Sequence, residues 1–121
     1  MPLDPRRDRS PSDDTADATQ RAILCRACGA EVTRPEHAIA VGAAGLHTFV
    51  NPAGEVFELR TFGHAPGCQA FGPATTQWTW FPGHAWRIGL CRACGHHLGW
   101  HYVGATSFWG LIATELHEPE G

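Results

Sequence analysis

The tetrapeptide Cys-Arg-Ala-Cys occurs twice in this chain, at positions 25–28 and 91–94, and glycine follows it both times. Two thiolates at this spacing on one tight turn can bind one edge of a metal ion, and the glycine permits the left-handed backbone that directs amide groups at the sulfurs. Two such turns complete a closed tetrahedral site that suits Zn²⁺, although iron can occupy the same four sulfurs. The pattern therefore predicts one structural zinc ion with four ligands: Cys25, Cys28, Cys91 and Cys94.

The long separation of the two cysteine pairs constrains the fold. A shared metal would tie the start of the domain to a strand near its end. A closed site leaves no position for water, so we expect no catalysis at the metal. Two alternatives remain for this region. The cysteines could form a redox-active disulfide pair, or His96 or His97 could replace a cysteine as a metal ligand. We expect these two histidines instead to lie at the surface or beside the sulfur ligands.

Composition limits the partners of this chain. The 121 residues carry a net charge of −3, and all nine basic residues are arginine, which suggests a GC-rich bacterial source. No basic stripe is present to follow a phosphate backbone, so we expect no nucleic-acid partner. The first 20 residues hold almost no large apolar side chains, and we predict a disordered tail over 1–20 and one domain over 21–121.

Targeting signals are not recognisable in the sequence. The N-terminal residues lack the apolar segment of a secretory signal, and no apolar run approaches the length needed to span a membrane. We therefore expect a cytoplasmic protein without a membrane partner, in which thiols stay reduced and cysteine pairs bind metal more often than they form disulfides.

The segments around the cysteine pairs have the pattern of short β-strands. Residues 98–103 alternate, so that Leu98, Trp100 and Tyr102 would share one face with His101 opposite. The stretch 63–73 contains too much glycine and proline for regular structure. No convincing amphipathic helix is present, and the predicted class is all-β. The predicted strands are 46–50, 55–62, 85–90, 98–103 and 108–116, with a hairpin turn at 51–54.

Tryptophan is concentrated in one region, with three residues in the nine positions 78–86. A tryptophan-rich core is the simpler explanation, and we assign Trp109 to the core. Because a domain of this size rarely needs three indoles in one small region, we favour an aromatic cage instead. Its predicted walls are Trp80, Trp86 and Trp100, with Tyr102 below or beside Trp100.

Two kinds of ligand would suit such a cage. A quaternary ammonium ion would be held by cation–π attraction, but cages of that kind usually add a carboxylate, and the nearest acids, Glu115 and Glu118, lie far along the chain. The other candidate is a small neutral ring that carries an imide, whose N–H and carbonyls could pair with the main chain of residues 78–80.

The order of the motifs is similar to that of a known family. Trp-Phe-Pro-Gly-x-Ala-Trp precedes Cys-x-x-Cys, Leu-Gly-Trp with an aromatic residue two positions later, and Phe-Trp-Gly-Leu. Upstream, Asn-Pro-Ala-Gly lies between Phe-Val and Glu-Val-Phe-Glu, and Ala-Pro-Gly-Cys follows at 65–68. Over residues 22–117 the chain resembles the cereblon thalidomide-binding domain family, known as the CULT domain, and its bacterial single-domain members.

This resemblance implies a fold and a ligand. The implied fold is a β-tent, in which two antiparallel sheets lean together at roughly a right angle and a Cys₄ zinc site joins them. The implied ligand is a glutarimide, a related cyclic imide or a uridine-type nucleoside, and protein termini that carry a cyclic imide present the same edge. The residues implied to bind it are Trp80, Trp86 and Trp100 as walls, Tyr102 as floor, the main chain of Trp78 and Trp80, and Asn51 and Pro52 at the rim.

The chain departs from the family pattern, and other functions remain open. Animal cereblons carry histidine at the position of Trp78, so we expect a changed affinity or ring preference. The ubiquitin-ligase function of full cereblon is not implied, since its other regions have no counterpart in this sequence. We favour a binding module over an enzyme, but a methionine sulfoxide reductase B-like activity of Cys68, or imide hydrolysis assisted by His84, would use the same chain.

Overall fold

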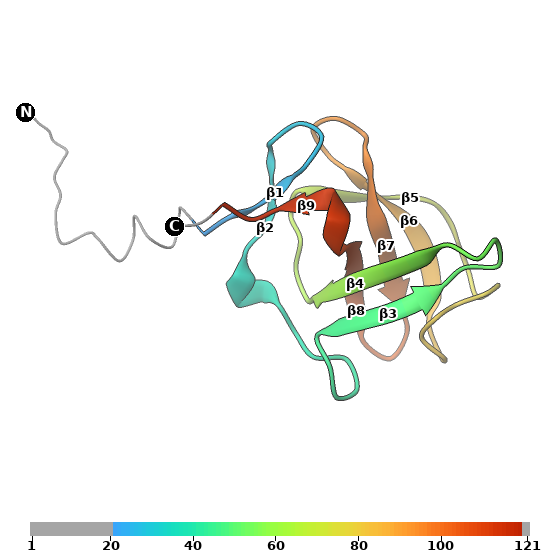
Figure 1. Cartoon of the computed structure of the whole chain (residues 1–121). Coiled ribbons are helices and arrows are strands. Elements are labelled where there is room, and N and C mark those ends of the chain that lie inside the picture. Colours follow the sequence, from blue (N-terminus) through green and yellow to red (C-terminus); the bar gives the residue numbers. More distant parts are fainter. Residues whose placement is uncertain (1–20, 120–121) are drawn as a thin grey trace, which may run out of the picture.

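The computed structural model describes residues 21–119 and is all-β, as predicted, with nine strands in two antiparallel sheets (Figure 1). The tail predicted to be disordered, 1–20, lies outside the described residues. The strands are β1 (Ile23–Cys25), β2 (Glu31–Thr33), β3 (Leu46–Val50), β4 (Val56–Phe62), β5 (Cys68–Thr75), β6 (Ala85–Cys91), β7 (His97–Val103), β8 (Ser107–Ile112) and β9 (Leu116–His117).

The two sheets differ in size. The smaller sheet has the order β2-β1-β9, and the larger one has the order β3-β4-β8-β7-β6-β5. Within the described residues the helical segments are the short 3-10 turns η1 (Pro35–His37) and η2 (Ala113–Glu115), and no helix there is long and apolar enough to cross a membrane.

Most predicted strands are present, but the segment 63–73 is not irregular throughout. From Cys68 onward it forms β5, which pairs with β6. The prediction was wrong because β5 is an edge strand, and an edge strand tolerates proline and glycine where no partner needs a donor. The predicted strand 108–116 also ends early, at Ile112, and the chain passes through η2 into β9 of the other sheet.

Two clusters of buried side chains form the core. The first lies where the two sheets meet, because it combines Ile23 and Leu116 of the smaller sheet with Phe62 and Leu111 of the larger one. The second contains Leu59, Tyr102 and Phe108 together with Phe81 from the loop between β5 and β6. Trp109 is half-buried against the first cluster, which agrees with its assignment to the core.

The prediction that Leu98 shares a face of β7 with Trp100 and Tyr102 is wrong. Leu98 is fully buried in the first cluster, whereas Trp100 and Tyr102 belong to the second. The pairing of β6 with β7 shifts register at Gly89 and Leu90, so β7 carries an extra residue next to Gly99. A bulge of this kind breaks the two-residue alternation, and the side chain before it changes face.

His101 should make the stability of the fold depend on pH. Its ring stacks on Trp109 at 4.3 Å, and its Nδ1 atom is buried with no hydrogen-bond partner in the described part of the chain. Burial, and secondarily the positive charge of Arg87, lowers the pKa of His101 from its ordinary value of 6.5. The unfolded chain therefore takes up a proton before the folded chain does, and stability should fall as the pH drops from about 6.5 through the lower folded pKa.

We expect His101→Phe to remove that part of the acid sensitivity. Urea unfolding between pH 7 and pH 4.5 should give a flatter stability profile for this variant than for the wild type. His117→Phe, at an exposed position of β9, is the matched control. A variant profile parallel to that of the wild type would contradict the assignment.

Candidate binding pocket and metal centre

The four cysteines of the repeated tetrapeptide come together at one end of the two sheets. Cys25 ends β1 and Cys91 ends β6, while Cys28 and Cys94 follow on tight turns. In both turns the following glycine has a left-handed backbone, with φ of 80° at Gly29 and 81° at Gly95, and donates to the carbonyl of the first cysteine at 2.8 Å. The turn geometry predicted from the sequence is therefore present.

The sulfur positions fit one metal ion. The sulfurs of Cys25 and Cys94 are 3.8 Å apart, those of Cys28 and Cys91 are 3.7 Å apart, and all four lie within 4.8 Å of one another. A tetrahedral ion with metal–sulfur bonds of about 2.3 Å requires sulfurs about 3.8 Å apart. Disulfide sulfurs would be about 2 Å apart, and all five cysteines are free.

The four thiols do not share one pKa shift. Burial raises the pKa of Cys91, but hydrogen bonds from the backbone of Cys94 and Ala93 and from the neighbouring thiols outweigh it and bring the pKa to about 7. The pKa of Cys25 is raised, mainly by burial. A backbone hydrogen bond from His96 lowers the pKa of Cys94, but burial and the neighbouring thiols outweigh it and raise the pKa to about 12.

The neighbouring histidines have other contacts, since His96 Nε2 lies 2.6 Å from Glu115 Oε1 and His97 Nε2 lies 3.0 Å from the carbonyl of Gly99. Among the residues that the structure describes, the four cysteines form the one group that could hold a metal ion.

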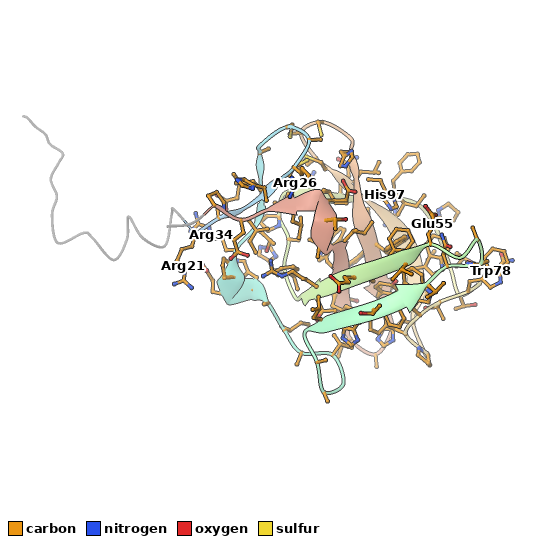
Figure 2. All side chains as sticks on the ribbon, viewed as in Figure 1. Arg21, Arg26, Arg34, Glu55, Trp78 and His97 are labelled. Atoms are coloured by element: carbon orange, nitrogen blue, oxygen red, sulfur yellow. The ribbon has the colours of Figure 1, made fainter. Side chains whose placement is uncertain are left out.

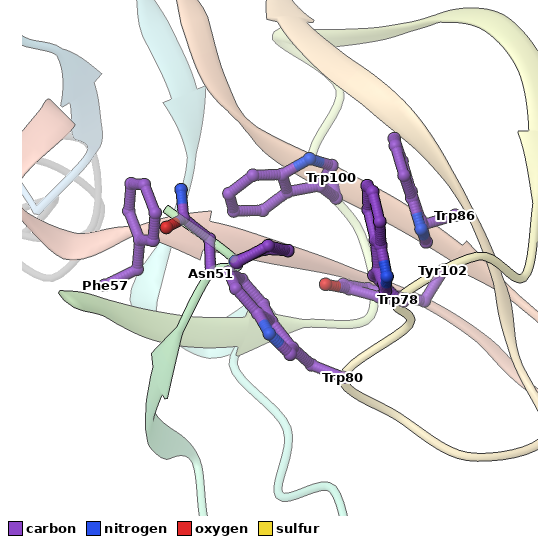
Figure 3. A pocket seen from close by; sticks show the side chains of 8 residues that line it. Asn51, Phe57, Trp78, Trp80, Trp86, Trp100 and Tyr102 are labelled. Atoms are coloured by element: carbon purple, nitrogen blue, oxygen red, sulfur yellow. The ribbon is translucent and has the colours of Figure 1, made fainter. Parts of the chain in front are cut away.

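A cavity of about 140 Å³ opens at the end of the β3–β4 hairpin (Figure 3). Figure 3 shows the indoles of Trp78, Trp80, Trp86 and Trp100 gathered at this space, with the phenol of Tyr102 beside them. Figure 2 places Trp78 near the hairpin end that carries Glu55, far from Arg21 and Arg34. The lining residues are Asn51, Pro52, Phe57, Trp78, Trp80, Trp86, Trp100 and Tyr102.

The hairpin of β6 and β7 positions three of these side chains. Trp86 of β6 is paired with Tyr102 of β7, and Trp100 lies two residues before Tyr102 on β7. Cross-strand partners and residues two apart point to the same face of a sheet. Tyr102 is only 2% exposed, whereas Trp86 and Trp100 are half-buried and keep open surface toward the cavity.

Aromatic contacts hold the remaining wall. The Trp80 ring stacks on Phe49 at 5.0 Å with an interplanar angle of 7°, and it meets Trp100 edge to face at 5.2 Å. Phe57 of β4 contacts Trp100 at 5.6 Å and also lines the cavity. Phe57 is not among the residues predicted from the sequence. The signal that could have found it is the alternation in residues 55–62, where Phe57 and Leu59 share the more apolar face.

The hairpin turn forms a rigid rim. The side-chain carbonyl of Asn51 accepts from the amides of Ala53 at 3.0 Å and Glu55 at 2.8 Å, and its amide group donates to the Glu55 carboxylate at 2.9 Å. Gly54 donates to the Asn51 carbonyl at 2.9 Å and closes the turn, which places Pro52 at the cavity.

The loop that carries Trp78 and Trp80 leaves some of its peptide groups unused. The amides of Gln77, Thr79 and Phe81 donate to Thr75 Oγ1, the Thr76 carbonyl and Thr79 Oγ1, respectively. The amide of Trp80 and the carbonyl of Trp78 make no hydrogen bond to the described part of the chain. A second cavity of about 310 Å³ adjoins them and shares Asn51, Pro52, Trp78 and Trp80 with the first.

The structure thus brings all seven predicted ligand-binding residues to one cavity, and their role in binding remains a prediction. The residues of the two enzyme alternatives lie elsewhere. Cys68 is buried in the first core cluster, away from the cavity lining. His84 contacts the ring of Phe108, and its Nδ1 lies 3.2 Å from the carbonyl of Pro82.

Cys68 should be chemically inert in the folded protein. Its side chain is 2% exposed, and burial, followed by the charges of nearby Cys91 and Cys25, raises its pKa to about 12. The reactive thiolate is therefore nearly absent at neutral pH. We expect iodoacetamide at pH 8 to leave Cys68 unlabelled in the folded protein and to label it in urea, as measured by peptide mass spectrometry. Rapid labelling under native conditions would refute this expectation.

The sequence of this chain is similar to that of known proteins. No model of a known protein family matches the chain. Protein cereblon from Gallus gallus is 32% identical over 103 residues, and protein cereblon from Xenopus tropicalis is 33% identical over 103 residues. Protein cereblon from Drosophila erecta is 34% identical over 105 residues.

These alignments cover most of this chain but a minor part of each relative. They include 78% of the chain, 23% of the Gallus and Xenopus proteins and 18% of the Drosophila protein. The all-β fold and the clustered cysteines agree with the same relationship. The chain therefore contains a cereblon-like domain, which corresponds to about a quarter of the length of the Gallus and Xenopus proteins.

Proposed function

We propose that this domain is a binding module that holds the ring of a cyclic imide, such as a glutarimide or a uridine-type base, between Trp80, Trp86 and Trp100. One observation carries the proposal: aromatic walls line a small cavity beside the amide of Trp80 and the carbonyl of Trp78, neither of which has a hydrogen-bond partner within residues 21–119. An imide offers the complementary set, with one N–H flanked by two carbonyls. Once a bound ring covers these two peptide groups, a ring that cannot pair with them is disfavoured.

The size of the cavity suits a single ring. Its volume is about 140 Å³, and an engineered apolar cavity of about 150 Å³ is known to bind benzene. Larger substituents on the ring would extend outward past Pro52 and Trp78 into the adjoining cavity.

The lining favours a neutral ring over a cation. None of its eight residues is aspartate or glutamate. Burial raises the pKa of Tyr102, so the phenol at the cavity stays uncharged at neutral pH. A quaternary ammonium ion would keep its attraction to the indoles but would have no counter-charge in the lining.

We propose Zn²⁺ as the metal of the four-cysteine cluster, in a structural role. Four thiolates in a closed tetrahedron suit zinc, and such a site has no open position for a substrate. Reduced thiols also fit a cytoplasmic location. Because Cys68 and His84 lie away from the cavity, the proposal is a binding function and not sulfoxide reduction or imide hydrolysis. The bacterial source remains a prediction from composition.

Removal of zinc should unfold the domain. Structural zinc sites in small peptides contribute an apparent binding free energy of about 10–16 kcal/mol, which matches or exceeds the total stability of about 5–15 kcal/mol that is typical of a domain. We expect one zinc per chain by native mass spectrometry, and no zinc and loss of cooperative unfolding in Cys28→Ser. Cys68→Ala is the control and should retain one zinc. A metal-free, fully folded protein would contradict the role.

Ligand binding should depend on the indoles that line the cavity. Titration with a glutarimide or uridine should change tryptophan fluorescence, and Trp86→Ala and Trp100→Ala should each abolish the change. Trp109→Ala should retain binding while it lowers the free energy of unfolding by about 3 kcal/mol. If a trimethylammonium ligand competes far better than any imide, the proposed ligand class is wrong.

A further inference from the structure

Residues 76–79 form a tight turn at the mouth of the cavity, and Trp78 adopts an unusual backbone conformation in it. The Thr79 amide donates to the Thr76 carbonyl at 3.2 Å, which makes Trp78 the third residue of the turn. Its φ is 57°, and among the described residues it is the only one other than glycine with a positive φ. A positive φ at this position is typical of type II turns, which normally place Gly or Asn there.

Two hydrogen bonds hold the residue before it. Turns with negative and positive φ at the third residue differ mainly by rotation of the central peptide, here the Gln77–Trp78 peptide. The carbonyl of this peptide accepts from the indole N–H of Trp86 at 2.8 Å. The amide of Gln77 donates to Thr75 Oγ1 at 3.1 Å, and Thr75 lies opposite Trp86 across β5 and β6. Side chains of β5 and β6 therefore hold both the amide and the carbonyl of Gln77.

We infer that Trp86 is a positioning residue as well as a wall of the cavity. Its indole N–H holds the Gln77 carbonyl and so keeps the turn in the orientation that presents the Trp78 indole at the cavity mouth. Without this donor, the central peptide rotates toward the negative φ that an L-residue favours. Trp78 lines both cavities and is 68% exposed, so neighbouring packing does little to hold it.

The test replaces only the N–H group. β-(3-Benzothienyl)alanine at position 86 keeps a bicyclic aromatic shape but carries sulfur where indole has N–H. In the ligand-free protein, a strong nuclear Overhauser effect between the Hα of Gln77 and the amide proton of Trp78 marks the peptide orientation that accompanies the positive φ of Trp78. We expect this signal in the wild type and a loss of most of its intensity in the analogue. Trp86→Phe, which also lacks the donor, should behave alike.

The control places the same analogue at Trp100, another wall residue, whose indole nitrogen makes no hydrogen bond to the described residues. The signal at residue 78 should be unchanged there. An unchanged signal in the analogue at 86, or an equal loss with the analogue at 100, would overturn the inference.

A second test uses coupling between the two tryptophans. Trp78→Gly removes the conformational strain, since glycine adopts a positive φ freely. In that background the analogue at 86 should change the turn much less than in the wild type, which a double-mutant cycle measures. Equal effects in both backgrounds would show that the indole N–H does not act through the backbone of residue 78.

The effect on affinity rests on the function proposed above, whereas the turn geometry does not. The analogue at 86 should weaken binding of a glutarimide by about fivefold, the usual effect of one lost hydrogen bond. Unweakened binding would overturn the ligand-related part of the inference. If the wild-type protein binds no imide, the proposed function fails, and the ligand-free spectra still decide the role of Trp86.

Discussion

The cluster of four cysteines is the contact on which the rest of the structure depends. It is the point where the end of β1 meets the end of β6, and its buried members, Cys25 and Cys91, belong to the core cluster that joins the two sheets. A domain of about a hundred residues has a marginal hydrophobic core, and a metal ion held by these four sulfurs would compensate for that deficit.

The same hairpin connects this cluster to the cavity. β6 begins beside Trp86 and ends at Cys91, and β7 returns past Trp100 to Tyr102. A strand rises about 3.3 Å per residue, so the first wall of the cavity lies roughly 17 Å from the sulfur ligands along β6. A metal ion at the cysteines would therefore act on the cavity by fixing the hairpin, and not through its own charge or chemistry.

The cavity combines rigid walls with a strained mouth. Four of its aromatic residues stand on paired strands: Phe57, Trp86, Trp100 and Tyr102. Asn51 closes the turn at the rim, whereas Trp78 occupies a conformation that a non-glycine residue disfavours. Strain of this kind persists only where the surroundings hold it, and it is often found at functional sites. The hydrogen bond from Trp86 links the two parts, because one side chain both lines the cavity and holds the adjacent turn.

Local chemistry allowed much of this protein to be predicted from its sequence, and the failures share one cause. Cysteine spacing, the glycine after each pair and the alternation in β3, β4, β6 and β7 depend on residues close in the chain. The sequence by itself thus determined the four cysteines that cluster, the all-β class and the aromatic residues of the cavity other than Phe57. The tertiary structure decided the strand character of β5, the face of Leu98, the inclusion of Phe57 and the conformation of Trp78, because edge position, register shift and cross-strand hydrogen bonds depend on partners distant in sequence.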